Sequence, residues 1–111
     1  MYFSISQEEL QRVVRAAGVL QLPEIAVTGD GTSITVTATN SKNPTADIFS
    51  IEVGESKHTF SMYIKAENII KLIHANYDVK ITSRGLAQFK SNSVVYYIAT
   101  EANSTFNKGN E

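Results

Sequence analysis

The chain has 111 residues, enough for one domain of ordinary size and too few for two. Hydrophobic residues make up 42% and charged residues 19%, which is the composition of a soluble globular domain and excludes disordered and collagen-like chains. The absence of cysteine excludes disulfides, thiol nucleophiles and cysteine-ligated zinc. A net charge of −1 disfavours a domain that wraps DNA phosphates, and no apolar run reaches the ~20 residues that span a bilayer.

The first half of the chain is predicted to form a strand, a helix and three more strands. Alternation predicts a strand at residues 2–5, and Ser6 with Glu9 forms the pattern of a helix capping box. Residues 25–28 and 33–39 are rich in β-branched residues and flank a hairpin signal, Gly29-Asp30-Gly31. The helix between these strands is predicted to bury residues at helical spacing and to fray at Gly18; the buried residues are Leu10, Val13, Val14 and Ala17.

The second half repeats this order after a strand at residues 49–53 and a turn at 54–56. Strands are predicted at 60–64, 79–82, 86–90 and 94–100, with a frayed polar tail from Asn103. A second helical stripe is expected to be buried and consists of Ala66, Ile69, Ile70 and Ile73. A shift of 59 positions places Ile5 on Ile64 and Arg12 on Lys71, which indicates an internal duplication.

Both predicted helices present polar residues on the side away from their buried stripes. These residues are Gln11, Arg12 and Arg15 of the first helix and Asn68 and Lys71 of the second. If the two halves pack side by side, Arg12, Arg15 and Lys71 form one cationic strip that follows a phosphate backbone loosely. The alternative is that these cations only complement the negative helix ends and keep this face solvated.

The sequence gives little support to catalysis or metal binding. His58 and His74 would need a third ligand such as Asp47 or Asp78, and no ligand spacing favours either. There is no Gly-x-Ser-x-Gly motif, and Gly29 to Thr32 joins two strands, unlike a phosphate-binding loop. We therefore predict no catalytic residue, no metal and no cofactor, and a small hydrolase is the least favoured interpretation.

The predicted last strand, residues 94–99, is apolar on both faces. One face belongs to the core, and the other carries Val95, Tyr97 and Ala99. Either the following tail or a neighbouring strand covers this second face, or it forms a groove with an aromatic wall for a short peptide motif.

Four stretches, in their order along the chain, carry a resemblance to a known family. They are Glu8–Arg15, Leu20–Val27, Asn76-Tyr77 and Val94–Thr105. They resemble the C-terminal domain of DNA polymerase sliding clamps of the T-even bacteriophage type, over about Phe3 to Phe106. Tyr96 to Ala99 is also similar to the last strand of the eukaryotic clamp.

The resemblance implies an α+β clamp domain, in which a duplicated β-α-β-β-β unit places two helices on one face of antiparallel sheets. It would occupy residues 1–106, followed by a frayed polar tail at 107–111. Six such domains form a ring around duplex DNA, with the helices lining the hole. Phage clamps of this kind carry two domains per chain and assemble as trimers. This chain is therefore expected to be a fragment of such a clamp or, alternatively, a member of a six-membered ring of single domains.

The family also implies a non-catalytic, phage-encoded protein that tethers the replicative polymerase to DNA in the cytoplasm of the infected host. By position, Arg15 resembles an inner-surface residue, with Arg12, Lys71, Gln11 and Asn68 beside it. The resemblance implies a groove at Tyr97, Ala99 and Leu86 for the C-terminal tail of the polymerase, the clamp loader and phage transcription factors. Subunits would pair through an edge strand formed by Asp47, Ile48, Phe49, Ser50, Ile51, Glu52 and Val53. The alternative is a structural or protein–protein interaction domain with no DNA role.

Overall fold

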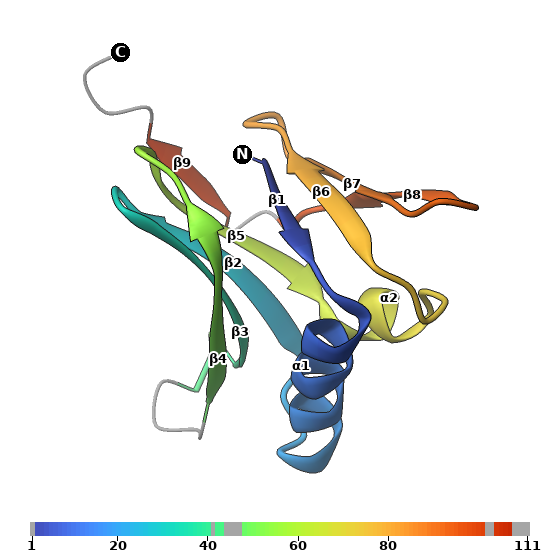
Figure 1. Ribbon diagram of the computed structural model, residues 1–111. Coiled ribbons are helices and arrows are strands. Elements are labelled where there is room, and N and C mark those ends of the chain that lie inside the picture. Colours follow the sequence, from blue (N-terminus) through green and yellow to red (C-terminus); the bar gives the residue numbers. More distant parts are fainter. Residues whose placement is uncertain (1, 41, 44–47, 102–103, 108–111) are drawn as a thin grey trace.

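The computed structural model describes residues 2–40, 42–43, 48–101 and 104–107 (Figure 1). The elements follow one another as β1 (Tyr2–Ile5), α1 (Gln7–Val19), β2 (Glu24–Asp30), β3 (Ser33–Thr39), β4 (Phe49–Glu55), β5 (Thr59–Lys65), α2 (Ala66–Ile70), β6 (Tyr77–Ile81), β7 (Leu86–Lys90), β8 (Val95–Ala99) and β9 (Thr105–Asn107). The predicted order of strand, helix and three strands therefore occurs twice, once in β1–β4 and once in β5–β8, and the α+β fold class is confirmed.

The strands of the described residues form two antiparallel sheets that exchange their first strands. The four-stranded sheet has the order β1-β6-β7-β8, and the five-stranded sheet has the order β4-β3-β2-β5-β9. Thus β1 pairs with β6 of the second half, while β5 pairs with β2 of the first half. This reciprocal pairing is what an internal duplication about a two-fold axis produces.

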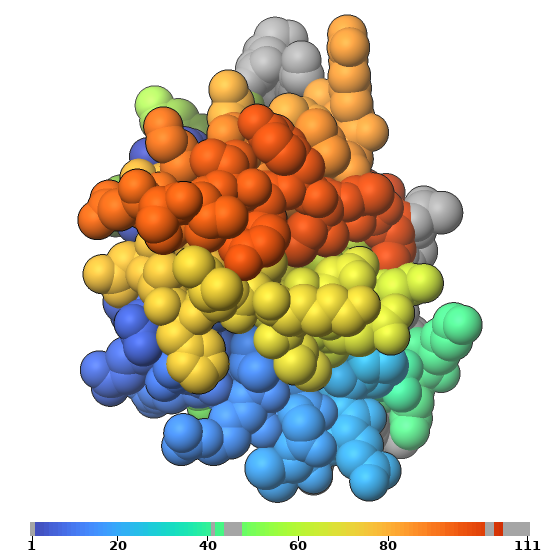
Figure 2. Space-filling view, turned by 90° about the vertical axis from the view of Figure 1, so that its right-hand side faces the viewer, coloured from blue at the N-terminus to red at the C-terminus, as the bar shows by residue number. Residues whose placement is uncertain are grey.

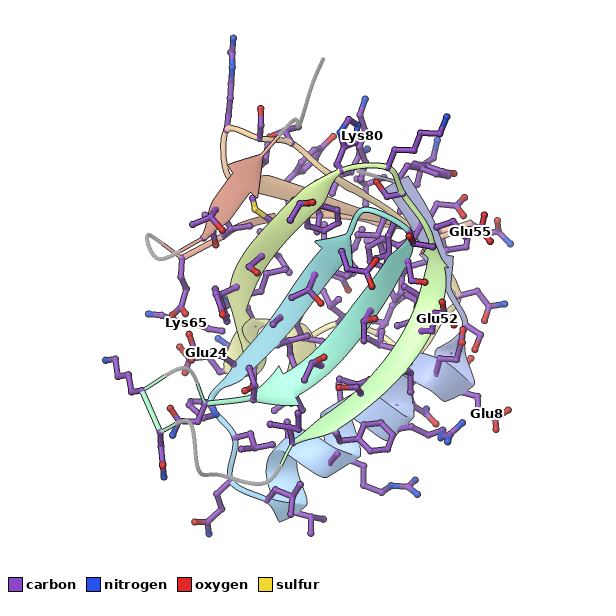
Figure 3. All side chains as sticks on the ribbon, turned by 90° about the vertical axis from the view of Figure 1, so that its left-hand side faces the viewer. Glu8, Glu24, Glu52, Glu55, Lys65 and Lys80 are labelled. Atoms are coloured by element: carbon purple, nitrogen blue, oxygen red, sulfur yellow. The ribbon has the colours of Figure 1, made fainter. Side chains whose placement is uncertain are left out.

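The core lies between the two sheets and the helices (Figure 1). α1 packs against β2, β3 and β4, while α2 packs against β2, β5 and α1, so both helices cover the same face of the five-stranded sheet. The other face of that sheet is open to solvent and is seen in Figure 3. The core side chains alternate along the strands as the sequence predicts, for example Ile34, Val36 and Ala38 of β3.

Short-range hydrogen bonds explain where α1 and the first hairpin begin and end. The Ser6 hydroxyl accepts a bond from the Glu9 amide at 3.1 Å, and the Glu9 carboxylate accepts one from the Ser6 amide at 2.9 Å. This is the predicted capping box. In the hairpin, Asp30 Oδ1 accepts bonds from the amides of Thr32 and Ser33, which closes the turn after β2.

Gly29 is required by a close approach between β2 and β5. A Cβ on this residue would lie 2.8 Å from the carbonyl oxygen of His58 and closer still to the ring of Phe60. Phe60 is the register partner of Gly29, so the missing side chain makes room for an aromatic ring in the core.

The second helix differs from its prediction. α2 ends at Ile70, and the exposed fractions of Ile70 and Ile73 are 53% and 47%, although both were expected to be buried. Leu72 is buried in their place, because the chain leaves the helix at Lys71 and the helical spacing of buried positions ends there. Tyr77, which is buried, donates a hydrogen bond from its hydroxyl to the Ile73 carbonyl at 2.7 Å.

Two strand boundaries also differ from the sequence-based expectation. The turn expected at 54–56 lies at residues 56–58, because a register shift gives β4 one extra residue opposite Ile34 and Thr35. The tail expected to fray from Asn103 instead contains β9, which pairs with β5 from Thr59 to Ser61 and includes Asn107. Residues 103 and 108–111 of the predicted tail lie outside the described residues.

Candidate nucleic-acid and partner interfaces

The two exposed arginines of α1 lie together beside the start of β4. Arg12 and Arg15 line a hollow of about 400 Å³ whose other walls include Val19, Leu20 and Phe49. The Cζ atom of Arg12 lies 6.0 Å from the centroid of the Phe49 ring, at the limit of a cation–π contact. Arg12 therefore presents its charge to solvent and also contacts the strand predicted to form a subunit edge.

The other residues predicted to face DNA lie closer to α2. Gln11 lines a groove between the helices together with Val14, Ile70 and Ile73. Lys71 is exposed at the C-cap of α2, and Asn68 is half-buried on the same helix. The structure thus brings Arg12 and Arg15 together, and an apolar groove lies between α1, which carries them, and α2, which carries Lys71. Sequence reasoning missed this groove because it expected Ile70 and Ile73 to be buried.

The residues predicted to bind partners lie on the solvent face of the four-stranded sheet. Leu86 is the register partner of Ala99, and Gln88 is the register partner of Tyr97, so Leu86, Tyr97 and Ala99 are neighbours on one face. All three are exposed, and the Tyr97 side chain has an exposed fraction of 64%. β8 is the last strand of its sheet, and Figure 2 shows it in orange-red at the molecular surface, above α2 in yellow.

A polar hollow of about 420 Å³ adjoins the Ala99 end of this face. Its walls include Arg84, Ala99, Thr100 and Ser104, whereas Tyr97 and Leu86 do not line it. The Thr100 amide donates to the Gly85 carbonyl at 2.8 Å, which holds the end of β8 against the β6–β7 turn. Sequence reasoning did not select Arg84, because nothing along the chain connects that turn with the residues that follow β8.

Two carboxyl groups from distant parts of the chain meet beside this region. Glu24 is buried, with an exposed fraction of 7%, and lies opposite Lys65 in the sheet, as Figure 3 shows. The side chain of Glu101 hydrogen-bonds Glu24, and this bond, burial and the charge of Glu24 raise the pKa of Glu101, opposed by Lys65 and Lys42. The surroundings of Glu101 therefore favour its protonated form.

The predicted subunit strand corresponds to β4, an edge of the five-stranded sheet. Phe49, Ile51 and Val53 are half-buried against the core, while Ser50 and Glu52 are exposed. Ile48 precedes the strand and is exposed, and Asp47 lies outside the described residues. On the side away from β3, no described strand pairs with β4, although β1 packs close to it, so β4 is an edge strand of its sheet.

His58 precedes β5, and His74 follows α2. Among the residues that the structure describes, no group of three or more histidine, aspartate and glutamate side chains is placed to hold a metal ion. Asp78, one candidate third ligand, accepts a hydrogen bond from the Ser4 hydroxyl at 2.8 Å. Neither helix within the described residues has the length and apolar character needed to cross a membrane.

Comparisons with known proteins agree with the architecture. A family model described as the gp45 sliding clamp, C terminal, matches residues 2–102. The protein named "Sliding clamp" of Vibrio phage KVP40 is 35% identical over 104 residues, which cover 90% of this chain and 47% of that protein. The chain thus spans about half the length of this curated relative.

Proposed function

Because the chain belongs to the gp45 sliding clamp family, as a C-terminal clamp domain, we propose that it forms part of a ring that encircles duplex DNA. The ring holds the replicative polymerase on its template and performs no chemical step itself. The observation that carries this proposal is that α1 and α2 lie on one face of the five-stranded sheet and expose Arg12, Arg15 and Lys71.

The helical face suits weak contacts with phosphates that do not depend on DNA sequence. Arg12, Arg15 and Lys71 supply a few positive charges, and Gln11 and Asn68 of the same helices add hydrogen-bonding groups. Phosphate contacts carry no base information, and a small number of cations keeps the affinity low. The exposed side chains of Ile70 and Ile73 have no group that binds phosphate, so this part of the helical face would not hinder the sliding of DNA.

Ring closure is assigned to the β4 edge and its flank. Residues 47–53 would pair with an edge strand of a neighbouring domain through backbone hydrogen bonds. Phe49 of this strand and the nearby Val19 and Leu20 would supply apolar contacts to that neighbour, while Arg12 and Arg15 at the same hollow stay open to DNA. The protein would act in the cytoplasm of the infected host, where a phage-encoded clamp meets the replication machinery.

Partners would dock on the exposed face that carries Tyr97, Ala99 and Leu86. An aromatic side chain next to two aliphatic ones favours a short peptide with an apolar anchor, such as the C-terminal tail of a DNA polymerase or of a phage transcription factor. The clamp loader would use the same face, so these partners would compete.

A fluorescence titration of labelled C-terminal tail peptides from phage replicative polymerases tests this assignment. We expect saturable binding at micromolar concentrations that Tyr97→Ala abolishes. Tyr2→Ala is the matched control, because Tyr2 is a tyrosine of nearly equal exposure, 63%, on the opposite edge of the same sheet. Failure of the peptides to bind both this chain and the chain joined to an upstream clamp domain would contradict the proposal.

The contact between Arg12 and Phe49 favours a second candidate, a structural domain whose basic residues only support its own fold. Binding of duplex DNA at low salt, where phosphate contacts are least screened, separates the two. The clamp assignment predicts weak binding that is lost in Arg12→Glu combined with Arg15→Glu and retained in Lys57→Glu, an exposed lysine on the β4–β5 turn. Equal behaviour of both variants favours the structural domain.

A further inference from the structure

The solvent face of the four-stranded sheet differs in kind from that of the five-stranded sheet. The five-stranded sheet exposes mainly hydroxyl side chains, such as Thr35, Thr37 and Ser50, and the last two bond each other at 2.9 Å. The four-stranded sheet exposes Leu86, Val95 and Tyr97 along its β7–β8 edge. An apolar strip of this kind on one open face marks a contact surface.

Basic residues lie next to this apolar strip. Lys80 on β6 has Gln88 of β7 as one register partner, and Tyr97 of β8 lies opposite Gln88 in turn. The register partner of Lys80 on β1 is Tyr2, so no acidic residue lies directly opposite Lys80 in either neighbouring strand. Lys90 lies in the next row opposite Asp78, whose carboxylate also accepts a hydrogen bond from Ser4. Arg84 is exposed on the turn before Leu86.

We propose that this face binds an acidic peptide segment, with an apolar anchor on Leu86, Tyr97 and Ala99 and a carboxylate at Lys80. The inference rests on the proposed partner surface. It adds that the partner is acidic and that Lys80 binds its carboxylate. Adjacent strands lie about 4.8 Å apart, so the backbones of β6 and β8 are about 10 Å apart. An extended segment spans about 3.3 Å per residue, which places the carboxylate two to four residues from the anchor.

The same cations would attract nucleic acid, but the apolar strip favours a peptide. Phosphate contacts need a continuous track of cations, whereas the apolar side chains of Leu86, Val95 and Tyr97 stand beside Lys80 and Lys90 on this face and interrupt such a track. A buried apolar anchor with a polar or charged rim is the usual anatomy of a protein–protein contact.

The test compares a labelled polymerase tail peptide with a neutral form in which each carboxyl, including the C-terminus, is an amide. We expect the acidic form to bind the 111-residue chain about two- to fivefold more tightly at low salt, the range for one exposed ion pair. Lys80→Gln should remove this difference, while Lys57→Gln, on the β4–β5 turn, should keep it. Raising the salt concentration should weaken the binding of the acidic peptide more than that of the neutral peptide. This comparison uses only the unmodified chain.

Equal affinity for the two forms, with binding still lost in Tyr97→Ala, would overturn the charge assignment and leave the proposed partner surface intact. Absence of binding by both forms, also after an upstream clamp domain is joined, would overturn both. Labelled duplex DNA whose binding is lost in Lys80→Gln, while the peptides bind that variant as before, would assign Lys80 to nucleic acid and also overturn the inference.

Discussion

The two halves of the chain share one strand framework and differ in their helices. β1 and β5 bury equivalent residues, with Phe3 and Ile5 in one and Met62 and Ile64 in the other. α1 spans 13 residues and begins with a capping box, whereas α2 spans 5 residues, and Lys65 at its N-cap makes no side-chain capping bond within the described residues. The first strands of the two halves are thus alike in the residues that they bury, whereas of the two described helices only α1 begins with a side-chain cap.

The surfaces of the two halves differ more than their cores. The hydroxyl-rich face belongs mainly to strands of the first half, and the apolar and cationic face belongs mainly to strands of the second half. Residues that pack the core keep the duplicated pattern because a cavity or an unpaired polar group there costs stability. Exposed positions carry no such constraint, so one face can become a contact surface while its counterpart stays polar.

The largest effect is expected from truncating equivalent core residues of the two halves. Ile5→Ala and Ile64→Ala should each lower the free energy of unfolding by about 2–5 kcal/mol, because both side chains are buried in the shared core. Urea denaturation measures both, with Tyr2→Ala as an exposed control. A loss below 1 kcal/mol at one site only, roughly the cost of a surface change, would break the equivalence of β1 and β5.

The capping box of α1 should account for about 1 kcal/mol of stability. Ser6→Ala removes the acceptor of the Glu9 amide and should destabilise the protein by that amount. Ser6→Asp keeps an acceptor and should restore most of the loss. Thermal denaturation followed by circular dichroism compares the three proteins, and equal midpoints would show that packing alone sustains α1.

Replacing Gly18 should strengthen α1 further and sharpen its contrast with α2. An added Cβ at Gly18 meets no described atom within 4 Å, and the residue lies in the last turn of the helix. Gly18→Ala should therefore stabilise the protein by about 0.5–1 kcal/mol, measured by urea denaturation. A destabilised variant would mean that the end of α1 needs glycine after all.

The smallest effects concern two carboxyls whose pKa values shift in opposite directions. Hydrogen bonds from the amides of Ser33 and Thr32 lower the pKa of Asp30. The contribution of ionised Asp30 to the stability of the fold is therefore present above its ordinary pKa of 3.8 and is lost as the pH falls through the lowered pKa. The pKa of Glu101 is raised. The contribution of protonated Glu101 to the stability of the fold is therefore present below its ordinary pKa of 4.5 and is lost as the pH rises through the raised pKa.

Substituting these two carboxyls separates their effects. Glu101→Gln should gain stability relative to the unmodified chain at neutral pH and lose that advantage in acid, because Gln donates to Glu24 at any pH. Asp30→Asn should show its largest loss at neutral pH. Urea denaturation over a pH series measures both, and parallel curves for Glu101→Gln and the unmodified chain would show that the fold does not raise the pKa of Glu101.

Local patterns predicted the strands and α1, and contacts between distant residues decided the rest. Ile34, Val36 and Ala38 alternate within one strand, and Ser6 and Glu9 are three residues apart, so the sequence suffices there. The end of α2 depends on how residues 71–76 pack, and β9 depends on β5, to which it pairs. Neither signal is local, so both were missed.

The candidate site follows the same division. Alternation placed Tyr97 and Ala99 on the face of the last strand that points away from the core, and the structure exposes both side chains. The roles of Arg12, Arg15 and Lys71 toward DNA stay predictions, but their exposure follows from helical spacing alone. Arg84 and the Glu24–Glu101 pair were missed, because a turn and a buried carboxyl acquire meaning only from residues that fold against them.

The exchange of β1 and β5 gives the domain the topology of a swapped dimer whose two copies are joined end to end. A cut in the turn at residues 56–58 would yield two fragments. The first would hold β2, β3 and β4 without their partner strand β5, and the second would hold β6, β7 and β8 without their partner strand β1. Each fragment carries the strand that the other lacks. The two pieces are therefore expected to fold only together, by fragment complementation.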